Sequence, residues 1–320
     1  MKQEPSPHCS RRTLLSAAAL AAAAGCSGTR PHPGPGGSTS SAALPRTTPW
    51  EPGPGEIRPD VELRAVQLVE ALGTWSRGGA GTAPARTRTA ALGLPADLAG
   101  QAGPLLAGAD EAALQVTDAQ YGGILADAAS VLVVCRQWRR TGGGPAVAGG
   151  TTVDVRLARA QPRWTVTALH PADPGPPAPR LPDAARSVLA HSRIRLPPAA
   201  EVDIRSGTVH AGVLTALLHL ADRYRMDVGV VRSGHPPDVF GTDRPSDHPK
   251  GRAVDVWRID DRAVVDPATP RGLVEGFMRA AAAAGSYNVG GPCLLSGGAT
   301  ADQFFSDDTH HDHVHIGFSA

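Results

Sequence analysis

The strongest constraint on this chain is a short segment, residues 246–255, in which one histidine and one aspartate flank a tight bend. His248 supplies an imidazole, and Gly251 allows the backbone to turn between the two polar side chains. Asp255 lies in the run 253–257, where alternating side chains predict a strand. The segment must therefore fold so that a rigid strand carries the carboxylate back to the imidazole.

The last residues of the chain add a second pair of imidazoles. In residues 313–318 a period of two places His313 and His315 on one face of a predicted strand and apolar side chains on the other. His248, Asp255 and His315 then form a set of two imidazoles and one carboxylate. A catalytic zinc ion uses three such ligands and keeps its fourth position open. An exposed His/Asp cluster without a fixed metal is the alternative interpretation.

These two motifs carry a family resemblance. The loop fits Ser-x-His-x-x-Gly-x-Ala-x-Asp, and with the His-x-His tail it resembles the zinc D-Ala-D-Ala carboxypeptidases and their relatives over about residues 182–320. That superfamily also contains peptidoglycan endopeptidases, phage endolysins and the Hedgehog signalling domain. The resemblance implies a Zn²⁺ ion held by His248, Asp255 and His315, with Ser246 close to the substrate. It implies a hydrolase that acts on peptidoglycan peptides.

The same resemblance leaves the general base open. Many relatives place Glu or Asp three positions before the last ligand, which is Asp312 here. The penicillin-insensitive murein endopeptidases have a His-x-x-His-x-His tail instead, which matches His310, His313 and His315. We expect His313 to be the base or the oxyanion partner, with Asp312 as the alternative. His310 or an arginine would then steady the oxyanion.

One motif departs from the family. Carboxypeptidase-type relatives carry Ser-Gly-Tyr-Arg upstream, whose arginine contacts the substrate, whereas residues 233–236 are Ser-Gly-His-Pro. We expect Arg232 or Arg244 to replace that arginine in substrate binding, and His235 to be a loop or pocket residue. The missing arginine leaves open a second function, a zinc-bearing binding module that recognises wall peptides or a protein without turnover.

The N-terminal sequence predicts export. Residues 10–15 resemble a twin-arginine motif, and the apolar run at 14–24 is too short to cross a bilayer as a mature helix. The run ends in a sequence that resembles a lipobox at Cys26. We therefore expect residues 1–26 to be a signal peptide and Cys26 to carry lipid that anchors the protein at the outer face of the membrane. An ordinary signal peptide with an incidental cysteine is the alternative.

The sequence after the signal peptide predicts two α+β domains. Residues 27–59 are rich in Pro, Gly and Ser and read as a disordered tether, and the Pro-rich stretch 171–181 separates a small domain, 60–170, from the zinc domain, 182–320. The small domain weakly resembles cystatin-like or nuclear-transport-factor-2-like domains, and the zinc domain is expected to contain an antiparallel sheet. We expect helices from Asp60 and at 183–190, 209–225 and 272–284, and strands near 128–139, 151–160, 163–169, 191–196, 227–232 and 253–257.

The composition limits the classes of partner that we expect. The net charge is +1, which gives no support to nucleic acid as a partner. The expected partners are peptidoglycan peptides and, through the lipid anchor, the membrane.

Once Cys9 and Cys26 are assigned to the signal peptide and the lipid site, Cys135 and Cys293 remain. In an oxidising compartment these two thiols could form a disulfide, or both could stay buried and free.

Overall fold

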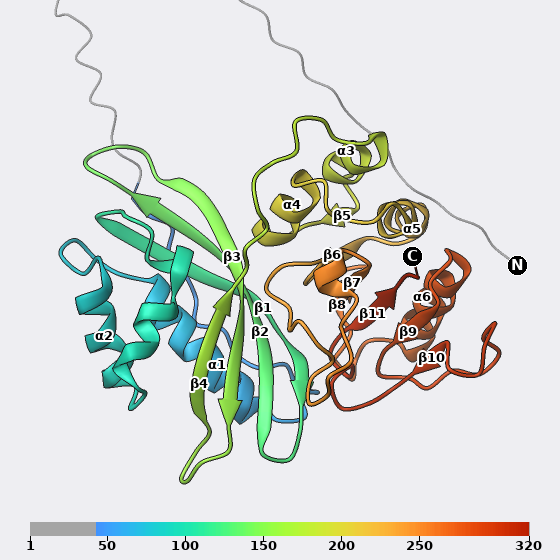
Figure 1. The fold of residues 1–320 in the computed structure, drawn as a ribbon, viewed down its shortest axis with the longest axis horizontal. Coiled ribbons are helices and arrows are strands. Elements are labelled where there is room, and N and C mark those ends of the chain that lie inside the picture. The colour runs from blue at the N-terminus through green and yellow to red at the C-terminus, as the bar shows by residue number, and fades with distance from the viewer. Residues whose placement is uncertain (1–42, 320) are drawn as a thin grey trace, which may run out of the picture. The chain divides into compact units, whose positions relative to one another are not determined.

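The computed structural model describes residues 43–319, which lie within one compact unit. It contains two β-sheets (Figure 1). Each sheet packs on its own hydrophobic core. We call residues 43–171 the N-terminal half and residues 172–319 the C-terminal half. Both combine helices with a sheet, so the predicted α+β class is confirmed. The predicted signal peptide and Cys26 lie outside the described residues, among which no helix is long and apolar enough to cross a membrane.

The N-terminal half is an antiparallel sheet of four strands with helix α1 packed against it. Helix α1 buries an apolar stripe of valines and leucines that joins the core under the sheet. Two α-helices and two short 3₁₀ helices precede the sheet, whose strands follow one another in chain order. The elements are α1 (Pro59–Gly73), α2 (Thr82–Ala91), η1 (Ala96–Gln101), η2 (Gly103–Leu106), β1 (Glu111–Ile124), β2 (Ala128–Arg140), β3 (Val147–Ala158) and β4 (Thr165–Pro171).

Strand β1 is the main difference from the sequence prediction. The first strand was expected near residue 128, but β1 precedes it and pairs with β2 along its whole length. The sequence of β1 contains Ala, Gln, Asp and two adjacent glycines, which have weak strand propensity, so pairing with β2 decides its conformation. Helix α1 begins at Pro59, one residue before the expected start at Asp60, and no side chain caps it.

The stretch that precedes α1 has fixed contacts rather than the disorder predicted for residues 27–59. The backbone N–H of Thr48 donates to the side-chain oxygen of Gln115 at 2.8 Å, and that of Trp50 donates to the Glu70 carboxylate at 2.9 Å. The Glu56 side chain is only 4% exposed. Residues 43–58 therefore pack on the rest of the N-terminal half. A proline-rich segment without apolar periodicity can still be ordered when side chains accept hydrogen bonds from its backbone.

The C-terminal half contains a sheet of seven strands with mixed direction, so the expected antiparallel sheet is wrong in part. The path runs β10-β9-β11-β7-β6-β5, with β8 paired to β7. β5 pairs in parallel with β6, and β10 with β9, because each pair is joined by a long connection. The elements are α3 (Asp183–Ala190), β5 (Ile194–Arg195), α4 (Pro198–Arg205), α5 (Ala211–Ala221), β6 (Met226–Val228), η3 (His248–Lys250), β7 (Ala253–Ile259), β8 (Arg262–Ala263), α6 (Arg271–Ala283), β9 (Asn288–Gly290), β10 (Phe304–Phe305) and β11 (Val314–Gly317).

Most elements of this half match the sequence prediction. The helices expected at 183–190, 209–225 and 272–284 correspond to α3, α5 and α6, although α5 is shorter at both ends. The expected strands at 191–196 and 227–232 shrink to β5 and β6, each only two or three residues long. Helix α4, which we did not expect, is a two-turn segment that starts at Pro198, the second of two prolines, and lies in the connection from β5 to β6.

The two remaining cysteines do not pair. Cys135 is buried in the core of the N-terminal half, and Cys293 is half-buried against the core of the C-terminal half. The Cys135 thiol donates to the carbonyl oxygen of Thr151 at 3.3 Å, and burial raises the pKa of this thiol to about 12. The interpretation as two free thiols is therefore the one that the structure bears out.

The halves meet along the outer edge of β1, which is a terminal strand of its sheet. The Gln120 side chain and the backbone N–H of Tyr121 both donate to carboxylates of the C-terminal half. Next to them, Gly123 lies so close to Phe240 that a Cβ on Gly123 would be 2.1 Å from the Phe240 Cβ. The C-terminal half thus covers an edge that would otherwise present unpaired backbone groups.

Replacing Gly123 with alanine should destabilise the protein by about 1–3 kcal/mol, because the new methyl group overlaps the Phe240 side chain. Gly100→Ala is the matched control, since a Cβ there meets no atom within 4 Å. Urea unfolding of the two variants provides the measurement. The double variant G123A/F240G, which also removes the Cβ of residue 240, should recover part of the loss. Equal effects of Gly123→Ala and Gly100→Ala would contradict this account of the contact.

Candidate metal centre

The turn between His248 and Asp255 is fixed by a left-handed glycine. Gly251 has a φ of +68°, which side chains rarely adopt, and a Cβ there would lie 2.2 Å from the backbone oxygen of Thr208. After this turn β7 begins, and it pairs with β11 so that Asp255 lies directly opposite His315. The predicted bend and both predicted strands therefore exist, and they bring the expected ligands together.

The three expected ligands converge on one point. His248 Nε2 lies 3.2 Å from Asp255 Oδ1 and 3.2 Å from His315 Nδ1, and the last two atoms are 3.0 Å apart. His248 is fully buried and Asp255 is 1% exposed. The alternative of an exposed His/Asp cluster without fixed geometry is therefore wrong for these two residues. Two imidazole nitrogens and one carboxylate oxygen at such spacing can hold a metal ion.

Neighbouring groups fix the orientation of each ligand. His248 Nδ1 lies 2.9 Å from the carbonyl oxygen of Val231 and donates there, which directs Nε2 at Asp255. The second carboxylate oxygen of Asp255 accepts a 2.8 Å hydrogen bond from Gln120 Nε2. A residue of the N-terminal half thus orients a ligand of the C-terminal half.

The surroundings keep these side chains in the protonation states that a metal requires. Burial raises the pKa of Asp255, but the nearby imidazoles of His248 and His313 outweigh burial and hold that pKa well below its ordinary value. Burial lowers the pKa of His315 to about 4, in spite of the opposing effect of Asp255. An ionised carboxylate beside a neutral imidazole is the donor set that binds a divalent cation.

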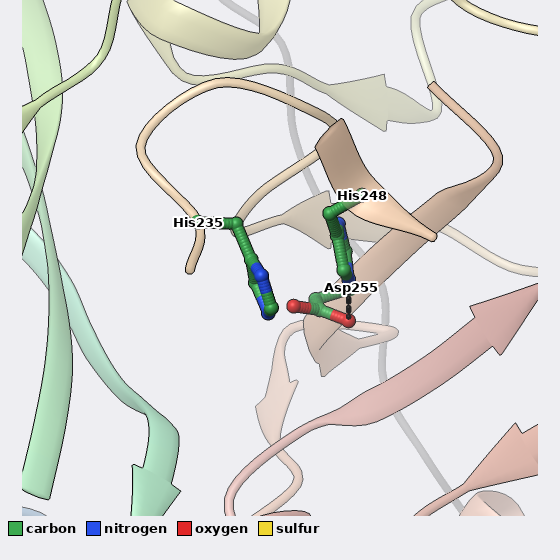
Figure 2. Close-up of side chains that lie close together, drawn as sticks. All are labelled: His235, His248 and Asp255. Atoms are coloured by element: carbon green, nitrogen blue, oxygen red, sulfur yellow. Dashed lines mark hydrogen bonds and ion pairs between the residues drawn. The ribbon is translucent and has the colours of Figure 1, made fainter. Parts of the chain in front are cut away.

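His235 joins this group, beyond the loop or pocket role that we expected for it. Its ring stacks on that of His248 with the ring centroids 4.0 Å apart and the planes 16° from parallel. Figure 2 shows both rings directed toward Asp255, and the ligand atoms of these three residues all lie within 4.8 Å of one another. His235 Nδ1 lies 3.0 Å from the carbonyl oxygen of Pro236, which directs the other ring nitrogen to the site. His235 can therefore serve as a further ligand.

His313 and Asp312 form a hydrogen-bonded pair next to the metal-binding group. His313 Nδ1 lies 2.5 Å from Asp312 Oδ1, and His313 Nε2 lies 3.7 Å from Asp255 Oδ1. The other oxygen of Asp312 accepts a hydrogen bond from the backbone N–H of Tyr121 at 2.9 Å. Burial lowers the pKa of His313, but the carboxylates of Asp255 and Asp312 raise it more, to about 9. Asp312 is thus turned toward β1 and holds the ring of His313.

A pocket of about 870 Å³ opens beside the site, between the two halves. Residues 121–125 of the N-terminal half form one part of its lining, and His310 and His313 belong to the part from the C-terminal half. His310 Nδ1 is held by the Asp307 carboxylate at 2.6 Å, and the ring packs edge-on against Phe305. A pocket with apolar walls and a few convergent polar groups is the usual form of a small-ligand or peptide site.

The three predicted substrate-binding residues differ in position. Arg244 is exposed and lines the pocket. Ser246 also lines the pocket, and its hydroxyl accepts a hydrogen bond from the backbone N–H of His248 at 3.3 Å. Arg232 lies outside the pocket lining. Its guanidinium lies 3.6 Å from the Asp203 carboxylate and donates to the carbonyl oxygen of Pro174 at 3.3 Å, so these two groups hold it elsewhere.

Gln120 and Tyr121 are the site residues that sequence reasoning missed. Both lie on β1, which we did not predict, and neither belongs to a motif with metal-ligand spacing. The only signal was a polar residue flanked by Ala119 and Tyr121, an alternation too short to predict a strand.

Comparisons with protein-family models, with curated proteins and with solved structures give no match for this chain.

Replacing Gln120 with alanine should weaken metal binding about 10–100-fold, because Asp255 loses the donor that orients its carboxylate. Gln115→Ala is the control, because this glutamine lies on the same strand but bonds Thr48 instead. Competition against a chelating dye measures both affinities. Equal metal affinities in the two variants would show that Gln120 has no part in orienting Asp255.

Proposed function

We propose that this chain is a zinc-dependent peptidase that cleaves stem peptides or cross-links of peptidoglycan. The observation that carries the proposal is the convergence of His248 Nε2, Asp255 Oδ1 and His315 Nδ1 within 3.2 Å of one another beside a pocket. Zinc with bonds of about 2.0–2.1 Å to a tetrahedral ligand set needs ligand atoms roughly 3.3 Å apart. The observed spacings are close to that value, and the donor types suit zinc.

The zinc ion would supply a Lewis acid and a water nucleophile that is active at neutral pH. The chain's own residues would bind the peptide and move the proton. The carboxylate of Asp255 helps to raise the pKa of His313 to about 9, and its charge would be offset once it ligates zinc. His313 Nε2, which faces the site, would then accept a proton from the attacking water and return it to the departing amine. Asp312 acts through His313: its carboxylate fixes the ring and favours the imidazolium that forms. This assignment favours His313 over Asp312 as the base.

His310 and Arg244 would contact the substrate. Both line the pocket, and the Asp307 carboxylate holds Nδ1 of His310. In its protonated form this ring could donate its other N–H to the oxyanion of the tetrahedral intermediate. Arg244 would bind a peptide carboxylate in place of the arginine that the family motif supplies. Peptidoglycan as the substrate rests on the family resemblance. Lipid attachment at Cys26 would place the enzyme outside the membrane, where that polymer lies.

The alternative function is a zinc-bearing module that binds wall peptides without cleaving them. The position of His235 favours it, because a third imidazole near His248 and Asp255 would close the coordination of the metal. The absent Ser-Gly-Tyr-Arg arginine points the same way. Against it, the His313–Asp312 pair is buried and oriented next to the ligands, which a purely structural metal does not need.

The purified protein, incubated with peptidoglycan and muropeptides, should release peptide products that a chelator abolishes and zinc restores. Mass spectrometry identifies the products, and metal analysis of the same sample gives the zinc content. His313→Asn should lower kcat by roughly a hundredfold or more while zinc is retained, because the proton acceptor is lost. Asp312→Asn should shift the pH profile of kcat, since it acts through His313.

Normal cleavage by His313→Asn would show that another group is the base. Stoichiometric zinc without products from any peptide would support the binding module instead. The variant His235→Ala separates the two functions further, because it should keep zinc and activity if His235 is not a ligand.

Arg244→Ala should raise KM several-fold with little change in kcat, because the exposed guanidinium would bind the substrate in both ground and transition states. Arg232→Ala is the matched control. Its guanidinium pairs with Asp203, so its loss should lower the melting temperature and leave KM unchanged. Steady-state kinetics and thermal unfolding test both expectations, and an unchanged KM in Arg244→Ala contradicts the assignment.

A further inference from the structure

A second group of acidic side chains and an imidazole lies at the junction of the halves, around Asp312. Glu56 comes from the segment that precedes α1, and Glu62 from the first turns of that helix. His311 and Asp312 come from the loop before β11. The ligand atoms of Glu56, His311 and Asp312 all lie within 4.8 Å of one another, which is within the reach of one bound ion.

His311 presents its Nε2 to this group, because its Nδ1 lies 2.7 Å from the backbone carbonyl oxygen of Asp308 and donates there. Burial lowers the pKa of the ring, but the hydrogen bond to Glu56 and the charge of Asp312 raise it more. His311 Nε2 faces Glu56 Oε2 at 3.2 Å and receives a longer contact, 3.3 Å, from the backbone N–H of Ile57. An imidazole lone pair and a carboxylate oxygen repel each other unless a proton or a cation lies between them.

Glu62 is the second and independent observation. It is 0% exposed, and neither of its carboxylate oxygens accepts a hydrogen bond from a donor in the described part of the chain. Its carboxyl group lies within hydrogen-bonding reach of the Glu56 carboxyl group, and the charges of Asp312 and Asp118 also act on it. A buried carboxylate is costly unless it is paired, and this one points at other acids.

Cationic side chains balance these acids only in part. Among residues 43–319, Glu56, Glu62, Asp118 and Asp312 make no ion pair with any lysine or arginine, and of these four acids the imidazoles of His311 and His313 face only Glu56 and Asp312. Burial raises the pKa of Glu62 to about 11, and nearby Glu56 adds to this effect. Either protons held by the carboxyl groups or a bound cation must therefore compensate the remaining charge. The convergence of an imidazole nitrogen with two carboxylates provides the ligands that a metal cation needs.

We propose that Glu56, Glu62, His311 and Asp312 form a second binding site, for a divalent first-row cation of the Mn²⁺ or Zn²⁺ type. One imidazole with several carboxylates suits these ions, whereas Ca²⁺ takes oxygen ligands alone. The site would join the segment before α1, the helix itself and the loop before β11. It does not depend on the proposed peptidase activity, although Asp312 would connect it to His313.

Metal content distinguishes the two sites. The full chain is stripped with chelator, loaded with Mn²⁺ or Zn²⁺ in separate experiments, freed of excess ion and measured by mass spectrometry of the elements. We expect two equivalents in the wild type and one in His248→Ala. Glu62→Gln keeps the shape of the side chain but should weaken the second equivalent more than tenfold, so that the double variant H248A/E62Q binds none.

Asp60→Asn is the matched control, because Asp60 lies on the same turn of α1 but is exposed and pairs with Arg58. It should retain two equivalents. Should Glu62→Gln fail to fold, titration of His248→Ala with Mn²⁺ still decides, since only the second site remains in that variant. Absence of any bound ion in folded His248→Ala overturns the proposal. The proposal is also overturned if Glu62→Gln binds as much metal as the wild type and unfolds at a higher temperature. Shared protons, rather than a cation, would then balance the acids.

Discussion

The buried carboxylate of Asp255 is the interaction on which the rest of the structure depends. It is 1% exposed and lies between the imidazoles of His248 and His315. A charge in such a place requires partners in several directions, and Gln120 of the other half supplies one of them. The turn at Gly251, the pairing of β7 with β11 and the approach of β1 together bury this charge and supply its partners.

Asp312 is a second buried carboxylate with partners in several directions, and it lies between the candidate metal centre and the junction of the halves. One of its oxygens holds the His313 ring and the other holds the backbone of β1 at Tyr121. On its far side lie Glu56 and His311. A single carboxylate thus connects the group with catalytic potential to the acidic group at the junction, so that a change in charge on one side is felt by the other.

How much the sequence predicted depended on whether a signal was local. His248, Gly251, Asp255 and His315 lie in short motifs whose spacing is itself the geometry, and the structure brings them together as expected. The direction of Asp312 could not be predicted, because a neighbouring strand decides it. β1 was missed because pairing with β2, rather than its own residue preferences, makes it a strand. His235 departs from a family pattern, and that pattern assigns it no role.

The contacts between β1 and the C-terminal half have a consequence for the order of folding. Gln120 and Asp255 are 135 residues apart in the chain, and Tyr121 and Asp312 are 191 residues apart. Contacts of such sequence separation close large loops and form slowly, after local hairpins and helices. The strand β11, which carries His315, depends on such contacts as well, since His248 and His315 are 67 residues apart. Complete assembly of the candidate ligand set is therefore a late event, and a metal ion bound by the whole set would report that the two halves have joined.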